Sequence, residues 1–236
     1  MQTVADRMAA VIARCQARAE DPEFQRQARR IADEEANARA VLAEVERNSR
    51  LLRSGIPVGL WNPVAAKRGE RSPLDQPKAT PALEAVKAHV DAPGACVFLT
   101  LSGKRGQGKT FAASYAVYAR GGRFVDAHDL VRLSSFDESE WRDLERQPVL
   151  AVDELGAEYL NDAYRANLYG LLNRRFADQR KTILCTNLAA PSFVARYCPD
   201  PEDRLLERLT KSGTWTNLDG DSLRRHWQDR EPGEEG

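Results

Sequence analysis

Between about residues 81 and 218, short continuous apolar runs alternate with amphipathic stretches. A strand buried on both faces is apolar throughout, whereas a strand with one face in water alternates apolar and polar residues. The stretch 164–176 places Leu168, Leu171 and Leu172 on one helical face, as expected for a helix packed on a sheet. The pattern therefore predicts an α/β fold with helices on both faces of a parallel sheet. The expected strands are 96–101, 123–125, 149–152, 182–186 and 215–218.

Residues 1–52 follow a different pattern, which predicts a small all-helical N-terminal domain. The segment is rich in Ala, Arg and Glu, and Asp21 followed by Pro22 is a typical helix start. Apolar residues then recur at spacings of three, four and multiples of seven, and Glu35 interrupts the series. Such a narrow stripe suits an antiparallel helical hairpin or a partner helix, and a helix packed on its own chain fits it equally well. The stripe consists of Phe24, Ala28, Ile31, Ala38, Leu42 and Val45.

Local composition suggests the domain boundaries. Residues 53–80 are Pro-rich and charged, which predicts a linker that leads into a second domain over residues 81–225. Trp61 is the one aromatic residue of this linker, and we expect it to pack on the surface of the second domain. Residues 226–236 are acidic and contain Gly, which predicts a disordered tail.

Charge and cysteine usage exclude several classes of protein. Lys and Arg together number 35, as do Asp and Glu, so any contact with nucleic acid has to come from a local patch. Four scattered cysteines form no Cys-x-x-Cys pair, which argues against a zinc module and a disulfide framework. We find no apolar stretch typical of a signal peptide or a membrane span and expect a cytoplasmic protein.

A glycine-rich segment lies between the first expected strand of the second domain and a helix. Residues 103–110 read Gly-Lys-Arg-Gly-Gln-Gly-Lys-Thr. Glycines let several backbone N–H groups approach one phosphate, and the following helix N-terminus favours an anion. The spacing places Lys109 at the β and γ phosphates of ATP and the Thr110 hydroxyl on Mg²⁺. The predicted nucleotide-binding residues are Gly103, Gly106, Gln107, Gly108, Lys109 and Thr110.

An acidic pair about forty residues later supplies the expected hydrolytic chemistry. Asp153 and Glu154 follow the apolar run 149–152, and the carboxyl ends of parallel strands meet at the same edge of a sheet. Asp153 is expected to hold Mg²⁺, and Glu154 to polarise the attacking water. The second acid favours hydrolysis over phosphoryl transfer to an acceptor, so we predict an ATPase.

Polar residues after later strands complete the candidate site. Asn187 follows the run 182–186, where its amide can hydrogen-bond the attacking water or the γ-phosphate. Arg204 and Arg208 lie four residues apart on one face of an expected helix. Asp221 and Ser222 are typical caps for a last helix.

From about Thr80 to Arg225 the chain resembles the DnaC/IstB group of AAA+ ATPases, and within it the replicative helicase loaders. The resemblance rests on the expected helix 80–84 before the glycine loop and on four short motifs. These are Leu-Ala-Val-Asp-Glu-Leu-Gly at 150–156, Thr-Asn-Leu at 186–188, Arg-Leu-Leu-Glu-Arg-Leu at 204–209 and Asp-Ser-Leu-Arg at 221–224. It implies that Arg208 is an arginine finger acting in a neighbouring subunit, with Arg204 as the alternative. It also implies that Arg224 is a second sensor in cis, although Leu223 stands where the family usually has an aromatic residue.

The resemblance further implies a function. Loaders grip a hexameric replicative helicase through N-terminal helices, assemble through their AAA+ domains on single-stranded DNA, and release the helicase upon ATP hydrolysis. An IstB-like helper of DNA transposition and an adaptor that uses ATP only as an assembly switch remain alternatives. A kinase or GTPase is disfavoured, since the acidic pair points to hydrolysis and no Asn-Lys-x-Asp motif occurs.

The sequence offers two candidate surfaces for DNA. The segment 127–147, where loaders carry a helical insertion against DNA, is short and acidic here. A basic cluster is the other candidate, although such clusters are usually solvated surface charge. It consists of Arg174, Arg175, Arg180 and Lys181.

Overall fold

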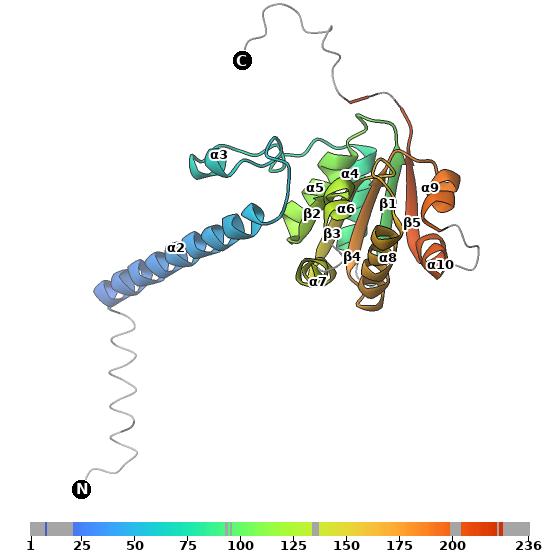
Figure 1. Cartoon of the computed structure of the whole chain (residues 1–236). Coiled ribbons are helices and arrows are strands. Elements are labelled where there is room, and N and C mark those ends of the chain that lie inside the picture. The colour runs from blue at the N-terminus through green and yellow to red at the C-terminus, as the bar shows by residue number, and fades with distance from the viewer. Residues whose placement is uncertain are drawn as a thin grey trace, which may run out of the picture. The chain divides into compact units, whose positions relative to one another are not determined.

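The computed structural model describes residues 8, 21–92, 94, 96–133, 137–198, 204–220 and 222–223, without the side chains of Lys67, Arg204, Leu206 and Thr210. The chain divides into two compact units, Met1–Ser49 and Arg50–Gly236. The second unit contains the sheet (Figure 1). None of the helices within the described ranges combines the length and apolar character that crossing a membrane requires.

Five strands form one sheet in the order β2-β3-β4-β1-β5. Every neighbouring pair runs parallel, which confirms the predicted parallel sheet. β4 lies between β1 and β3, so the ends of three strands that are far apart in the sequence come together. The strands are β1 (Phe98–Gly103), β2 (Arg123–Asp126), β3 (Val149–Leu155), β4 (Lys181–Thr186) and β5 (Gly213–Leu218).

Helices cover both faces of the sheet, because alternate residues of each apolar strand point to opposite sides. On one face Leu99, Ala151 and Ile183 pack with α4 (Pro81–Asp91) and α5 (Lys109–Arg120). On the other, their neighbours Phe98, Leu150 and Leu184 pack with side chains of a second group of helices. Those helices are α6 (Ala127–Arg132), α7 (Glu138–Arg146), α8 (Asp162–Ala177), α9 (Ala190–Tyr197) and α10 (Arg204–Lys211).

The Pro-rich segment 53–80 belongs to the same compact unit as the sheet, although the sequence predicts a linker there. Ile56, Trp61 and Leu74 are buried in the cluster on the α5 side, so Trp61 packs on this domain as expected. The carbonyl of Ser54 accepts a hydrogen bond from the Phe124 N–H at 2.6 Å, which fastens the segment to β2. Prolines and charges indicate irregular backbone in this segment, but they do not reveal its few buried apolar anchors. The segment contains one short helix, α3 (Pro63–Lys67).

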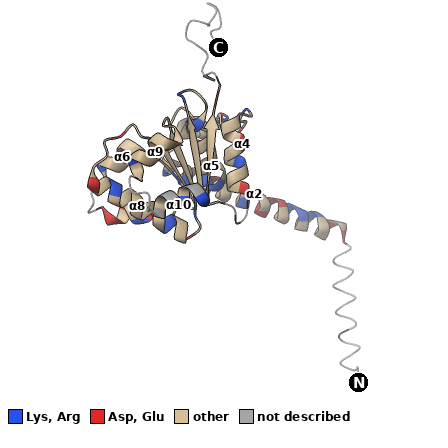
Figure 2. Cartoon of the chain, turned by 90° about the vertical axis from the view of Figure 1, so that its right-hand side faces the viewer, with Lys and Arg blue, Asp and Glu red and all other residues tan. Residues whose placement is uncertain are grey.

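Helix α2 (Pro22–Leu52) accounts for the described part of the N-terminal region. It begins as predicted, with the Glu23 N–H donating to the Asp21 carboxylate at 2.9 Å. Acidic and basic residues alternate along it (Figure 2), and the apolar stripe is exposed, with Ile31 at 51%, Leu42 at 63% and Val45 at 56%. Residues 1–7 and 9–20, which the predicted hairpin would need, lie outside the described residues, as does the predicted tail 226–236.

Arg175 is fully buried and corrects the predicted basic cluster. Its guanidinium donates to the carbonyls of Leu144, Glu145, Gln147 and Lys181 and to the Thr182 hydroxyl, at 2.7 to 3.1 Å. Burial lowers its pKa to about 9. The side chain thus holds the carbonyls at the end of α7 and the start of β4 in place of solvent. It cannot contact DNA in this fold.

The other members of the cluster are also engaged in part. Arg180 donates to the Arg146 carbonyl at 2.6 Å, and Lys181 to the Cys96 carbonyl at 3.2 Å. Arg174 is exposed. Hence the cluster is not the free basic surface that the sequence suggests.

Replacing Arg175 with Met should lower the free energy of unfolding by roughly 2 kcal/mol or more, because several buried carbonyls lose their donor. Arg174→Met is the matched control: it removes an exposed guanidinium from the adjacent residue and should change stability by less than about 0.5 kcal/mol. Urea denaturation followed by circular dichroism measures both. Equal stability of the two variants would contradict the structural role of Arg175.

Candidate nucleotide-binding site

The glycine loop connects β1 to α5, as the sequence predicts. Gly106 and Gly108 have φ angles of 87° and 82°, in the left-handed region that residues with a Cβ rarely adopt. Gly108 is the N-cap of α5 and has no side chain that could occupy the helix N-terminus. The first amides of α5 therefore face the loop without a side-chain cap, which leaves them available to an anion.

Lys109 is the first residue of α5 and is 8% exposed. Its Nζ donates to the Gly103 and Lys104 carbonyls at 2.6 and 2.9 Å and to Asn187 Oδ1 at 2.9 Å. Burial lowers the pKa of this ammonium. The contact with Asn187 places that amide beside the loop, so the two predicted phosphate contacts lie together.

Thr110 and Asp153 face each other across the junction of α5 and β3. The Thr110 hydroxyl donates to Asp153 Oδ2 at 2.7 Å, and the Glu154 N–H donates to Asp153 Oδ1 at 2.9 Å. Asp153 is 5% exposed, and burial raises the pKa of its carboxyl. A hydroxyl and a carboxylate are oxygen donors of the kind that Mg²⁺ prefers, so these two residues fit the predicted metal role.

Glu154 is next to Asp153, and its side chain is exposed. Its φ of 56° is unusual for a residue with a side chain. The Ala157 N–H donates to its carbonyl at 3.1 Å, which closes a turn at the end of β3. The turn brings the carboxylate to the pocket that contains Lys109.

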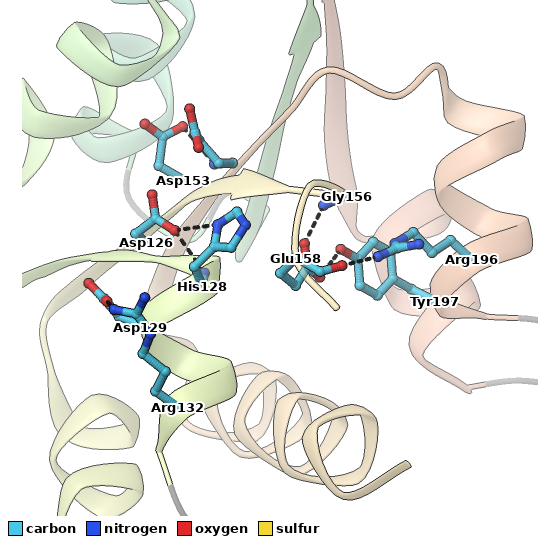
Figure 3. A network of polar contacts seen from close by, with 10 residues as sticks. Asp126, His128, Asp129, Arg132, Asp153, Gly156, Glu158, Arg196 and Tyr197 are labelled. Atoms are coloured by element: carbon cyan, nitrogen blue, oxygen red, sulfur yellow. Dashed lines mark hydrogen bonds and ion pairs between the residues drawn. The ribbon is translucent and has the colours of Figure 1, made fainter. Parts of the chain in front are cut away.

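Two residues beside Glu154 were not among the predicted site residues. Asp126 ends β2, adjacent to Asp153 in the sheet register, and accepts hydrogen bonds from the backbone and ring of His128 at 2.7 and 3.0 Å (Figure 3). Possible ligand atoms of Asp126, His128 and Glu154 lie within 4.8 Å of one another. The rule that parallel strands end at one edge would have found Asp126, had it been applied to β2.

A cavity of about 950 Å³ opens over the loop. Its walls include Lys109, Asp153, Glu154 and Asn187, so the predicted phosphate, metal and water contacts converge on one space. A further wall, which the sequence does not reveal, comes from the segment 53–80. Its lining residues are Pro57, Leu60, Pro73, Gln76, Lys78, Ala79 and Thr80.

The chain after β5 returns to the glycine loop. The Leu223 N–H donates to the Gly106 carbonyl at 2.8 Å, and Gln107 Nε2 donates to the Gly220 carbonyl at 3.1 Å. Thus Gln107, predicted to bind nucleotide, holds the C-terminal segment here. Leu223 lines the cavity. Arg224 is the next residue but lies outside the described residues, so its predicted role is not tested.

Arg208 on α10 does not line the cavity within the described part of the chain. Its guanidinium donates to the Asn173 side chain and lies over the Phe176 ring at 4.7 Å from the centroid, both on α8. These are contacts within the subunit, on the face of the sheet opposite α5. Its predicted action in a neighbouring subunit remains a prediction, and the side chain of the alternative, Arg204, lies outside the described residues.

A scan against models of protein families and a search of curated proteins found no match. Among solved structures, the chain is similar to DnaI at 18% identity and a TM-score of 0.50, covering 64% of this chain and 89% of that one. AMPPCP-bound DnaA from Aquifex aeolicus gives 18% identity and a TM-score of 0.51, covering 64% of this chain and 51% of that one. The DnaC helicase loader gives 22% identity and a TM-score of 0.49, covering 62% and 96%.

The likeness to DnaI and DnaA shows the fold of this chain. Its five-stranded parallel sheet with helices on both faces is that of AAA+ P-loop NTPase domains. This confirms the predicted fold class for the second compact unit. The small helical N-terminal domain stays a prediction.

Lys109→Ala should weaken ATP binding at least tenfold, because its buried ammonium lies at the loop where the β and γ phosphates are expected. Lys104→Ala is the matched control, since Lys104 lies in the same loop and its exposed side chain does not line the cavity. The affinity of this variant for ATP should stay within about twofold of the wild-type value. Titration with a fluorescent ATP analogue measures both. Unchanged affinity in Lys109→Ala would contradict the assignment of the loop.

Proposed function

We propose that this chain is an ATP-dependent loader of a hexameric replicative DNA helicase. In this proposal it binds ATP and Mg²⁺ at the glycine loop and hydrolyses ATP with water. Helix α2 binds the helicase, and the AAA+ domains assemble side by side on single-stranded DNA. The observation that carries the ATPase part is the convergence of Lys109, Thr110, Asp153 and Glu154 on one cavity.

The proposed chemistry divides among these residues. The helix N-terminus and Lys109 bind the phosphates, while Thr110 and Asp153 hold Mg²⁺, which neutralises charge that develops on the phosphoryl group. Lys109 now donates to backbone carbonyls and Asn187, so phosphate oxygens would replace acceptors that it already uses. Glu154 is exposed to the cavity and can accept a proton from water.

The exposed stripe of α2 supports the partner-binding part. Ile31, Leu42 and Val45 lie along one helix, and the side chain of each is more than half exposed. Several large apolar side chains exposed along one surface favour a site where a partner binds. An amphipathic helix of this kind docks in a groove or against another helix. We propose a helicase as that partner because residues 80–225 resemble the replicative helicase loaders in their motifs.

The proposal predicts ATP turnover that rises when single-stranded DNA and a hexameric replicative helicase are added. Glu154→Gln should lower stimulated turnover by roughly 100-fold or more while ATP still binds. Glu140→Gln, on the exposed side of α7, is the matched control and should keep turnover. A steady-state phosphate-release assay measures these rates.

Affinity capture with the full chain and with a chain that lacks residues 1–49 tests the partner. Recovery of the helicase by the full chain alone supports loading. Recovery of a transposase instead would indicate a transposition helper. Tight ATP binding without turnover under every condition would indicate an adaptor.

The proposal also places Arg208 in the active site of a neighbouring subunit. The Arg208→Ala chain and the Glu154→Gln chain should each be inactive alone, and mixing the two should restore part of the turnover. In an equal mixture, about a quarter of the subunit interfaces would combine an intact Glu154 from one chain with an intact Arg208 from the next. Asn173→Ala is the control, because it removes the Arg208 contact within the subunit and keeps the guanidinium. If turnover recovers when Glu154→Gln is mixed with Arg204→Ala, but not when it is mixed with Arg208→Ala, the arginine finger would be Arg204.

A further inference from the structure

The backbone of Glu154 is held in an unfavourable conformation. Its φ of 56° lies in the left-handed region, which is unfavourable for a residue with a side chain and persists only where neighbours enforce it. Two residues later Gly156 has a φ of 103°. The direction of the Glu154 carboxylate therefore depends on what holds the turn 154–157.

Two side chains hold this turn from outside. The Thr186 hydroxyl on β4 donates to the Leu155 carbonyl at 2.6 Å. The Gly156 N–H donates to Glu158 Oε2 at 2.7 Å. Together they hold both polar atoms of one peptide group, the one that joins Leu155 to Gly156 just after Glu154.

Glu158 is 3% exposed and is itself anchored to α9 (Figure 3). Its other carboxylate oxygen, Oε1, accepts a hydrogen bond from the Tyr197 hydroxyl, and its backbone carbonyl accepts one from the Arg196 guanidinium. Burial, with the nearby Glu158 carboxylate, raises the pKa of Tyr197, so the phenol stays a neutral donor. The carboxylate thus bridges the loop after β3 and a helix that follows β4.

We infer that Glu158 is a positioning residue for Glu154. This inference rests on the proposed ATPase function and adds a residue that does not line the cavity. By tying the Gly156 N–H to Tyr197, the Glu158 carboxylate keeps the turn closed and holds the Glu154 side chain toward the cavity.

The test compares kcat with ATP affinity in the full chain under stimulated conditions. Glu158→Ala leaves the Gly156 N–H and the Tyr197 hydroxyl without their acceptor, so kcat should fall roughly 10- to 100-fold. The Kd for ATP should stay within about twofold, since Glu158 lines no part of the cavity. Glu158→Gln keeps an oxygen for the Gly156 N–H and should recover most of kcat. Tyr197→Phe, which should fold even if Glu158→Ala does not, should give an intermediate kcat.

Asn161→Ala is the matched control for stability. Asn161 caps α8 at the end of the same loop by accepting a hydrogen bond from the Tyr164 N–H at 2.8 Å, so its loss should lower the stability of the fold. This variant should keep kcat. If Tyr197→Phe and Glu158→Ala keep wild-type kcat, or if Asn161→Ala loses as much, the inference is overturned. Absence of turnover in the wild-type chain would instead overturn the proposed function.

Discussion

The position of β4 between β1 and β3 is the constraint on which the candidate site depends. Each of the three strands ends at the same edge and delivers a different group there: the glycine loop, the acidic pair and Asn187. These groups are far apart in the sequence, and only parallel pairing brings them to one cavity. The pairing itself is stabilised by apolar residues that alternate between two separate clusters, one on each face of the sheet.

The charged groups at this edge of the sheet have backbone and side-chain partners. Lys109 is buried among carbonyl oxygens and Asn187, and Asp153 is buried between the Thr110 hydroxyl and the Glu154 N–H. Burial disfavours both charged forms, lowering the pKa of Lys109 and raising that of Asp153. The phosphate and the Mg²⁺ of the proposed function would each relieve one of these costs.

The sequence predicts those parts of the site that follow from short-range rules. Glycine spacing identifies the loop around Lys109, and the end of an apolar run identifies Asp153. The wall formed by the segment 53–80, the return of Leu223 to Gly106 and the burial of Arg175 are not predicted. They depend on which surfaces meet in three dimensions, and a charged or Pro-rich pattern looks the same whether or not it packs.

Two features of the described residues bear on the proposed assembly. The apolar stripe of α2 is exposed. Arg208, the arginine of α10 whose side chain is described, does not line the cavity. The last turn of α2 carries Leu51 into the core, and the chain continues from there directly into the segment that walls the cavity. The proposed partner of α2 would therefore be connected to a nucleotide in the cavity through this anchored stretch of backbone. Because linkage is reciprocal, any effect of nucleotide on that wall would act on partner affinity as well.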